Sequence, residues 1–374
     1  MKIGVLSSFG YICNVNNYGS LLQYFALQTY LVRKGYEVYW IRFNEDKNNP
    51  NVIYKYIKKL VLNSNLKILT EHFNEKGFNS FIEKYINLSD FEYRSYKEIK
   101  KNPPLADLYI VGSDQVWNGY SPDRYLMFIP HSKPKISYAV SFGKNTIKKY
   151  LKPLMWYYLK GFKAISVREK AGIEICNSVG RKEAKYVIDP TFLLTKDDYM
   201  EFVNNEKIQS EKDSYIFSYF VNPFNNNIFP YMKDCNKLKE QTHCRLITTA
   251  IQGAEKAFNG ENIINPSPLK WIELIANADY ILTNSFHGMA FSIIMRKQFL
   301  VIPQKGAGEE QNNRQMDLLS TLDLNDRIYN DKMDLFEQIN KPIIWDQIEP
   351  KIHHFVDYSK NFLYTNSKLP KLAY

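Results

Sequence analysis

The segment from Ala278 to Pro303 constrains the fold of this chain more than any other. Its sequence, ADYILTNSFHGMAFSIIMRKQFLVIP, predicts a strand, a short polar turn, a helix and a second strand. His287 falls at the turn, where a strand ends and a helix begins. In open α/β sheets ligands bind at that place, and the free N–H groups of a helix amino terminus attract anions. The segment therefore predicts a titratable side chain beside an anion site.

The start of the chain predicts a second unit of the same kind. Lys2–Leu6 and Glu37–Phe43 are strand-like, and between them Ser20–Lys34 is a helix that is apolar around most of its circumference. Ser20 is the expected N-cap of that helix, and Gly35 is the expected glycine after its end. A strand, loop, helix and strand in this order indicate a parallel sheet.

Four short apolar runs continue the N-terminal part. They follow Asn44–Asn102, a stretch rich in Lys and Asn that predicts helices and loops, with helical patches at Val52–Leu62 and Phe78–Ile86. Each run ends in polar or charged residues, and its length favours a strand covered on both faces. The runs are Leu108–Val111, Ile136–Val140, Ala164–Val167 and Lys185–Ile188.

A polar segment, Asp189–Lys212, separates these runs from a second set of strands. We expect an N-terminal α/β domain over residues 1–200, a C-terminal α/β domain over 212–335, and helices within 340–374 that pack back on the first domain. Two doubly wound, Rossmann-like domains that face each other across a cleft form a GT-B-like fold, and this is the expected fold class. The strands of the second set are Ser214–Val221, Arg245–Thr249, Tyr280–Thr283 and Phe299–Ile302.

The formal net charge of +10 is compatible with nucleic acid, an anionic membrane or an anionic small molecule as partner. The chain has no nucleic-acid-binding motif, and we expect no compact cluster of Lys and Arg with interleaved aromatic residues. We therefore expect no nucleic acid partner. The four cysteines lack the spacing of metal ligands, so no metal site is expected.

The first residues, MKIGVLSS, favour a β-strand over a secretion signal, and no apolar run has the length of a membrane span. A cytoplasmic location is expected, with contact to the inner face of the membrane as a further expectation.

Three residues lead the candidates for chemistry. His287 is suited to proton transfer, which contributes about 10²- to 10⁴-fold in rate, and Asn284 or Ser285 would cap its helix. Arg168 follows a strand and is suited to binding a carboxylate or phosphate. Asp114 follows another strand and is a candidate base or hydroxyl ligand. Structural alternatives remain open for each: a hydrogen-bonded turn histidine, an arginine paired with adjacent charges such as Glu169, and an aspartate that caps a helix.

Four further residues lie in loops at the same edges of the expected sheets. Asn17 and Gly19 belong to the first loop, NVNNYGSLLQ, which resembles a phosphate-binding turn but lacks the known nucleotide patterns. Lys305 and Arg314 follow the last strand of the second set in a glycine-containing loop. These cations would close on an anion, or they would be ordinary solvated side chains.

Seven segments together resemble, in order and spacing, the polysaccharide pyruvyl transferase family. The resemblance runs from about Lys2 to Leu319 and implies a GT-B-like fold. It also implies transfer of pyruvate from phosphoenolpyruvate to a sugar of a cell-surface glycan as a ketal. The segments are NNYGSLLQYFALQTYL, LYIVGSDQVWN, SYAVSFGK, SVREKAG, VIDPTFLL, ADYILTNSFHGMAFSIIMRKQF and NNRQMDLL.

The resemblance also assigns roles to residues. It places the family's functional histidine at His287 and its phosphoenolpyruvate-binding arginine at Arg168. Where some members carry Arg-Leu-His, this chain has Ser285, Phe286 and His287, so one basic ligand is absent. Lys305 or Arg314 would compensate for it.

The expected activity is therefore a pyruvyl transferase that uses phosphoenolpyruvate as donor substrate and no cofactor. The expected acceptor is a hexose of a capsule or exopolysaccharide precursor, including one carried on a lipid-diphosphate-linked oligosaccharide. A GT-B glycosyltransferase that uses a nucleotide sugar is the alternative enzyme. A non-catalytic glycan-binding protein is the alternative from another class.

Overall fold

A computed structural model describes residues 1–7, 17–43, 75–221, 229–250 and 263–368 of the chain. Its N-terminal half is built on a parallel five-stranded sheet of order β3-β2-β1-β4-β5. A two-stranded sheet, β6-β7, continues it through the bridges Ile136–Ala164 and Val140–Val167. The strands are β1 Lys2–Leu6, β2 Glu37–Phe43, β3 Leu88–Tyr93, β4 Leu108–Val111, β5 Lys135–Ser137, β6 Ser166–Val167 and β7 Lys185–Tyr186.

The C-terminal half repeats this plan. Its parallel five-stranded sheet has the order β10-β9-β8-β11-β12, with β8 at the centre. In both sheets the strand order reverses beside the central strand, and such switch points hold the ligand sites of open α/β sheets. The strands are β8 Tyr215–Phe220, β9 Arg245–Ala250, β10 Ile263–Ile264, β11 Tyr280–Thr283 and β12 Gln298–Val301.

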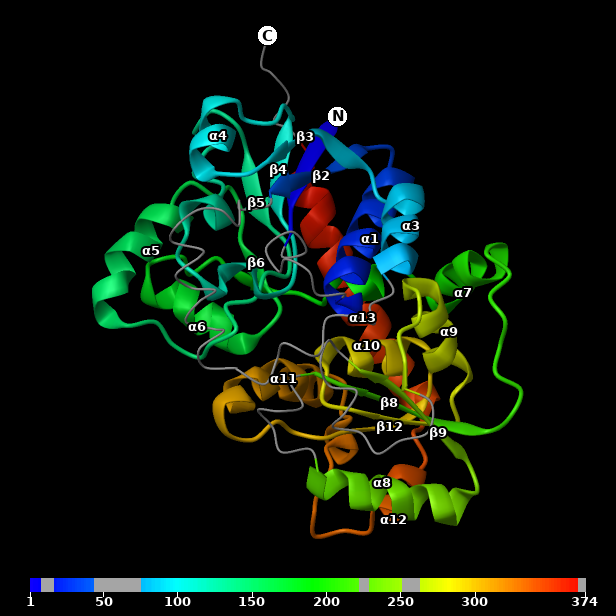
Figure 1. The fold of residues 1–374 in the computed structure, drawn as a ribbon. Coiled ribbons are helices and arrows are strands. Elements are labelled where there is room, and N and C mark those ends of the chain that lie inside the picture. Colours follow the sequence, from blue (N-terminus) through cyan, green and yellow to red (C-terminus); the bar gives the residue numbers. More distant parts are fainter. Residues whose placement is uncertain (8–16, 44–74, 222–228, 251–262, 369–374) are drawn as a thin grey trace, which may run out of the picture.

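Helices surround both sheets, and Figure 1 shows α1, α9 and α10 where the two halves meet. Those of the N-terminal half are α1 Tyr18–Arg33, α3 Glu75–Tyr85, α4 Tyr96–Lys101, α5 Lys152–Leu159, α6 Lys170–Ser178 and α7 Lys196–Asn205. The others are α8 Phe229–Thr242, α9 Pro268–Asn277, α10 Phe286–Ile294, α11 Asn313–Thr321, α12 Leu335–Asn340 and α13 Trp345–Ser367.

The last helix, α13, contacts both halves of the molecule (Figure 1). Near its start, Glu349 forms an ion pair with Arg296 at the end of α10. Further along, the Ser359 hydroxyl accepts a hydrogen bond of 2.9 Å from the backbone N–H of Ile188 in the N-terminal half. The expected domain limits of 1–200 and 212–335 stay predictions.

Several expected elements differ from those of the structure. The first helix begins at Tyr18, and its N-cap is Asn17, whose side chain accepts a hydrogen bond from the N–H of Ser20. Ser20 is therefore a residue of the helix and not its cap. The structure also contains two strands that were not expected, β3 within Asn44–Asn102 and β10. The helical patch expected at Val52–Leu62 lies outside the described residues.

The regular strands β5, β6 and β7 are shorter than their apolar runs. The run Ile136–Val140 forms β5 only as far as Ser137, and Val140 adds an isolated bridge. The polar segment Asp189–Lys212 contains helix α7, which a capping box starts at Thr195.

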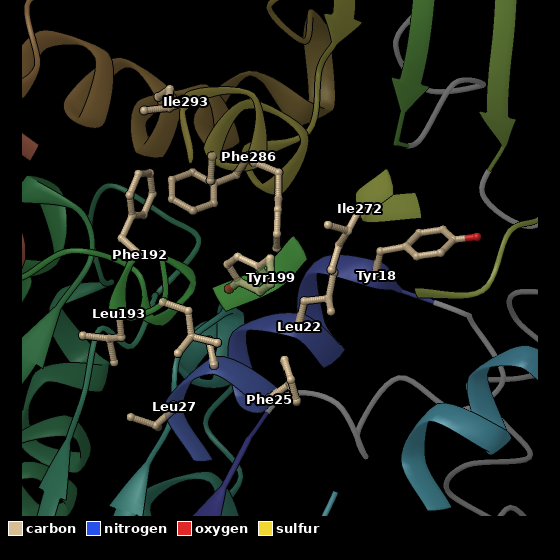
Figure 2. Close-up of a cluster of buried hydrophobic side chains, with 14 of the residues drawn as sticks. Tyr18, Leu22, Phe25, Leu27, Phe192, Leu193, Tyr199, Ile272, Phe286 and Ile293 are labelled. Atoms are coloured by element: carbon tan, nitrogen blue, oxygen red, sulfur yellow. The ribbon is translucent and has the colours of Figure 1, made fainter. Parts of the chain in front are cut away.

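A buried hydrophobic cluster joins the two halves, as Figure 2 shows for part of it. Tyr18, at the start of α1, stacks on Trp271 of α9 with ring centroids 5.2 Å apart and an interplanar angle of 8°. The Tyr18 hydroxyl donates a hydrogen bond of 2.8 Å to the Pro266 carbonyl. Burial of each such side chain stabilises the fold by roughly 1.5–3 kcal/mol. The contact fixes the first turn of α1 against the C-terminal half.

None of the helices in the described ranges is long and apolar enough to cross a membrane.

Candidate active site

Four side chains from both halves meet at the carboxyl ends of the strands. Asp114 follows β4, Arg168 follows β6 and Asp189 follows β7, all in the N-terminal half. His287 lies in the first turn of α10, directly after β11, in the C-terminal half. The structure thus brings together the three leading candidates of the sequence and adds Asp189 to them.

Arg168 is at the centre of this cluster. Its Nη2 donates a hydrogen bond of 2.7 Å to Asp114 Oδ1, and its Nη1 donates one of 2.8 Å to Asp189 Oδ2. The side chain is only 1% exposed. Its partners are therefore two carboxylates from separate loops, and the neighbouring Glu169 instead accepts a hydrogen bond from the N–H of Phe142. Arg168 Nε has no hydrogen-bond partner in the part of the chain that the structure describes.

Asp189 was not predicted as a site residue. The sequence placed it at the domain boundary, and the only signal was its position directly after an apolar run, before Pro190. Its Oδ1 accepts hydrogen bonds from the N–H and the hydroxyl of Thr191. Although burial by itself would raise the pKa of Asp189, His287 and Arg168 hold it well below its ordinary value. Asp189 is therefore a fixed negative charge behind Arg168 and His287.

Asp114 combines a strained backbone with a depressed pKa. Its φ of 72° and ψ of −174° belong to a region that is essentially restricted to glycine, and such strain occurs mostly at functional sites. Burial raises its pKa, but Arg168, His287 and Arg314 outweigh that effect and lower the pKa to about 2. The side chain makes no capping hydrogen bond to the turn that follows it. Asp114 nevertheless occupies the N-cap position of that turn, and the backbone of Gln115 also lowers its pKa, so the capping alternative for Asp114 stays open.

His287 faces this ion-pair network across the boundary between the halves. Its Nε2 lies 3.5 Å from Arg168 Nη1 and 3.8 Å from Asp189 Oδ2. Asn284 and Ser285 were the two expected N-caps of α10. The N-cap is Ser285, whose hydroxyl accepts a hydrogen bond from the N–H of Gly288. The helix amino terminus thus fixes the backbone of His287 while the ring reaches the N-terminal half.

Gly19 packs directly on the other side of the His287 ring. A Cβ atom at position 19 would lie 2.0 Å from His287 Nδ1 and 2.3 Å from its Cγ, far inside contact distance. Asn17, the other residue expected from this loop, caps α1 with its side chain. The role of Gly19 is therefore to leave room for the histidine.

Substituting Gly19 by Ala should lower the free energy of unfolding by about 1–3 kcal/mol, the usual cost of overpacking. It should also reduce activity, because His287 must move. In a His287→Gly background the same substitution should cost much less, since the three nearest atoms all belong to the His287 side chain. Urea denaturation of the four variants measures this coupling. Equal costs in both backgrounds would contradict the contact.

Arg314 and Phe286 complete the cluster. Arg314 Nη1 lies 3.9 Å from Asp114 Oδ1, and burial together with the neighbouring Arg168 lowers the pKa of Arg314 to about 10. The Phe286 ring lies under both guanidinium groups, with centroid distances of 4.6 Å to Arg168 Cζ and 5.9 Å to Arg314 Cζ. Lys305 points to solvent instead: its side chain is 67% exposed and its Nζ lies 3.6 Å from Asp331.

The amino termini of four helices converge on these side chains. Gly19 belongs to the first turn of α1, His287 to that of α10 and Arg314 to that of α11, while α6 begins directly after Arg168 and Glu169. The helix dipoles favour an anion at such a place. Some of the N–H groups are already bonded: that of Lys170 donates to Asp317, and those of Ser20 and Gly288 donate to the capping side chains. Burial raises the pKa of Glu169, while Arg168 and Arg314 oppose that rise.

Within the described ranges, no group of three or more His, Cys, Asp or Glu side chains is arranged to hold a metal ion. The arrangement instead offers a histidine for proton transfer, carboxylates to orient it and arginines for an anion.

Comparison with solved structures shows the fold class of this chain. MnaA of S. aureus, solved with UDP, superposes with a TM-score of 0.54 at 11% identity, covering 99% of this chain and 98% of that one. The glycosyltransferase of kitacinnamycin gives a TM-score of 0.51 at 12% identity, with 98% of each chain covered. UDP-GlcNAc 2-epimerase from Neisseria meningitidis gives 0.50 at 10% identity, with 96% and 94% covered. The expected GT-B-like α/β fold is confirmed.

The family follows from the sequence itself. The family model "Polysaccharide pyruvyl transferase" matches residues 17–306, which include Asp114, Arg168, Asp189 and His287. The chain belongs to this family, and it is a transferase of the polysaccharide pyruvyl transferase type. A comparison with curated proteins gave no match.

Proposed function

We propose that this protein transfers the pyruvyl group of phosphoenolpyruvate to a hexose of a cell-surface polysaccharide precursor and forms a cyclic ketal. The observation that carries this proposal is the cluster of His287, Arg168 and Arg314 at four helix amino termini, in a chain of this family. Phosphoenolpyruvate brings a phosphate and a carboxylate. Arginines and helix N–H groups are suited to both.

The first proposed step adds one sugar hydroxyl across the double bond of phosphoenolpyruvate. His287 donates a proton to C3, and the hydroxyl oxygen bonds to C2, where positive charge develops. Asp114 accepts the proton that the hydroxyl loses, and this proton then replaces the one that His287 has given to C3. Its side chain is 11% exposed, whereas that of Asp189 is fully buried, so Asp114 is the carboxylate that a substrate can reach.

The second proposed step closes the ring. A neighbouring hydroxyl of the same sugar bonds to C2, the bond from C2 to the phosphate oxygen breaks, and phosphate leaves with the remaining proton. Arg314, whose side chain is 10% exposed, would bind the anionic groups directly, and Arg168, which is 1% exposed, would attract them by its charge from behind. Asp189 positions Arg168 and His287. The reaction needs neither a metal nor a redox cofactor.

Thermal unfolding with candidate donors tests the donor side. Saturation at about 100 times the dissociation constant stabilises a protein by about 2.7 kcal/mol, so phosphoenolpyruvate should raise the melting temperature. Stabilisation by nucleotide sugars instead would favour the glycosyltransferase alternative. Binding of glycans that survives loss of both His287 and Arg168, without turnover, would favour the glycan-binding alternative.

Turnover is tested by phosphate release from phosphoenolpyruvate in the presence of hexose-containing acceptors, with mass spectrometry of the product. We expect the product to gain one pyruvyl group. Lipid-diphosphate-linked oligosaccharides belong among the acceptors, because such precursors are presented at the inner membrane face.

A further inference from the structure

Helix α5 and the turn before it carry exposed aromatic side chains. Tyr150 is 72% exposed, Trp156 51% and Tyr157 45%, although large hydrophobic side chains are usually covered. Figure 1 shows α5 at the outer edge of the N-terminal half, away from the C-terminal half. One segment at the outside of the molecule therefore carries three exposed aromatic side chains.

The same surface is strongly basic. From Arg124 to Arg168 the sequence contains no Asp or Glu. Lys148, Lys149 and Lys160 are exposed and Lys152 is partly buried, whereas the exposed Lys163 donates to backbone carbonyls at the end of α13. Lys160 Nζ lies 4.8 Å from the Trp156 ring centroid and 4.7 Å from that of Tyr157, and Lys148 Nζ lies 5.8 Å from the Tyr150 ring centroid, so each exposed aromatic ring of this segment has a lysine beside it. The expectation that the chain has no compact cluster of basic and aromatic residues is therefore wrong. The exposed residues of this segment are named the α5 patch: Lys148, Lys149, Tyr150, Trp156, Tyr157 and Lys160.

The elements beside α5 leave the charge of the patch positive. Tyr96 of α4 lies near Tyr157, and α4 adds exposed lysines at 97, 100 and 101. On the other side, Gly180 lies near Trp156, and the carboxylate next in the chain, Glu183, forms an ion pair with Arg181. On α4, Glu98 accepts a hydrogen bond from the N–H of Arg94.

We propose that the α5 patch docks the protein on a bilayer surface that contains anionic lipids. Trp and Tyr are enriched at the membrane–water interface, and exposed lysines are attracted to anionic headgroups. A single-stranded nucleic acid would instead be expected in a basic groove, whereas α5 projects from an edge of the molecule (Figure 1). The aromatic helix with its flanking lysines is therefore best matched to a lipid surface.

The α5 patch is connected to the candidate active site by a short stretch of chain. Phe142 donates its N–H to Glu169, next to Arg168, and the chain then runs through Lys144 to the patch. Asn145 hydrogen-bonds with Asn313 at the start of α11, beside Arg314. A docked protein would thus present the site near the headgroups. This step rests on the proposed function, since it places a lipid-linked acceptor close to His287.

Vesicle co-sedimentation of the full chain tests the docking without any substrate. Vesicles of phosphatidylcholine with phosphatidylglycerol should bind the protein, phosphatidylcholine alone should bind it weakly, and added salt should release it. The double variant Lys148→Gln/Lys149→Gln should lose about 30-fold in affinity, equivalent to about 1 kcal/mol for each lysine. Trp156→Ala should weaken binding as well.

Matched variants away from the patch provide the control. Lys332→Gln/Lys341→Gln and Tyr358→Ala change exposed residues of the same types and should leave binding unchanged. Equal losses in these controls, or absence of binding to anionic vesicles, would overturn the proposal. The proposal would also be overturned if the protein formed a dimer, or bound an oligonucleotide, and that association were lost in Trp156→Ala. The patch variants should keep full turnover on a water-soluble acceptor, so loss of docking and failure of the proposed reaction are distinguished.

Discussion

His287→Ala should reduce pyruvyl transfer from phosphoenolpyruvate by about 10²- to 10⁴-fold, the usual contribution of a positioned proton donor. The ring has a partner on each side, with Nε2 near Arg168 and Asp189 and Nδ1 against Gly19. Such contacts hold the ring in position for proton transfer. The loss should therefore appear in kcat, measured as phosphate release at saturating phosphoenolpyruvate.

The same variant should still bind the donor. The arginines and the helix amino termini remain, so phosphoenolpyruvate should still raise its melting temperature. His353→Ala is the matched control, because His353 is exposed on α13, and it should retain full turnover. Full turnover of His287→Ala would remove His287 from the mechanism. Loss of donor stabilisation together with turnover would assign His287 to binding instead.

Much of the fold could be predicted because buried parallel strands appear in a sequence as continuous apolar runs. Strands β1, β2, β4 and β11 have the expected limits. Strand β3 was missed because its sequence, LSDFEY, mixes charged and aromatic residues in the way of an edge strand. Strand β10 was missed because it has two residues. Neither has a local signal that separates it from a loop.

Those site residues that lie just after the ends of strands could be predicted from the sequence. Asp114, Arg168 and His287 were found because each stands directly after an apolar run. Asp189 stands there too, but its polar surroundings indicated a boundary, and only the fold shows that Arg168 needs a second carboxylate.

The fit of Gly19 against His287 joins the two halves of the molecule, so no sequence pattern contains it. Lys305 and Arg314 were equivalent in the sequence. Their burial separates them, since the Arg314 side chain is 10% exposed and that of Lys305 is 67% exposed.

Arg168→Met should be the most destabilising single substitution in the cluster, with a loss of about 3–5 kcal/mol in the free energy of unfolding. The substitution leaves the buried carboxylates of Asp114 and Asp189 without their common partner. Arg33→Met is the control, because it breaks a more exposed ion pair with Asp198 and should cost at most about 1 kcal/mol. Urea denaturation at neutral pH measures both. A loss for Arg168→Met as small as that of the control would contradict the central role of the ion pairs.

The pH dependence identifies the cause of that loss. The pKa of Asp114 falls from an ordinary 3.8 to about 2 in the folded protein, and that of Asp189 is also lowered. A carboxyl whose pKa is depressed by folding adds stability above its unfolded pKa, and this stability disappears as the pH falls through the folded pKa. The unfolded chains of the two proteins titrate alike, so the pH dependence of their difference follows from the folded pKa values alone. The difference should be full at neutral pH and begin to shrink above the ordinary pKa of 3.8, because burial raises the pKa of the unpaired carboxyl groups in Arg168→Met. It should continue to shrink as the pH falls toward the wild-type pKa of Asp114, about 2. The triple variant Arg168→Met/Asp114→Asn/Asp189→Asn should be more stable than Arg168→Met, because no unpaired charge remains. A pH-independent deficit would mean that Arg168 stabilises the fold by packing against Phe286 rather than by charge.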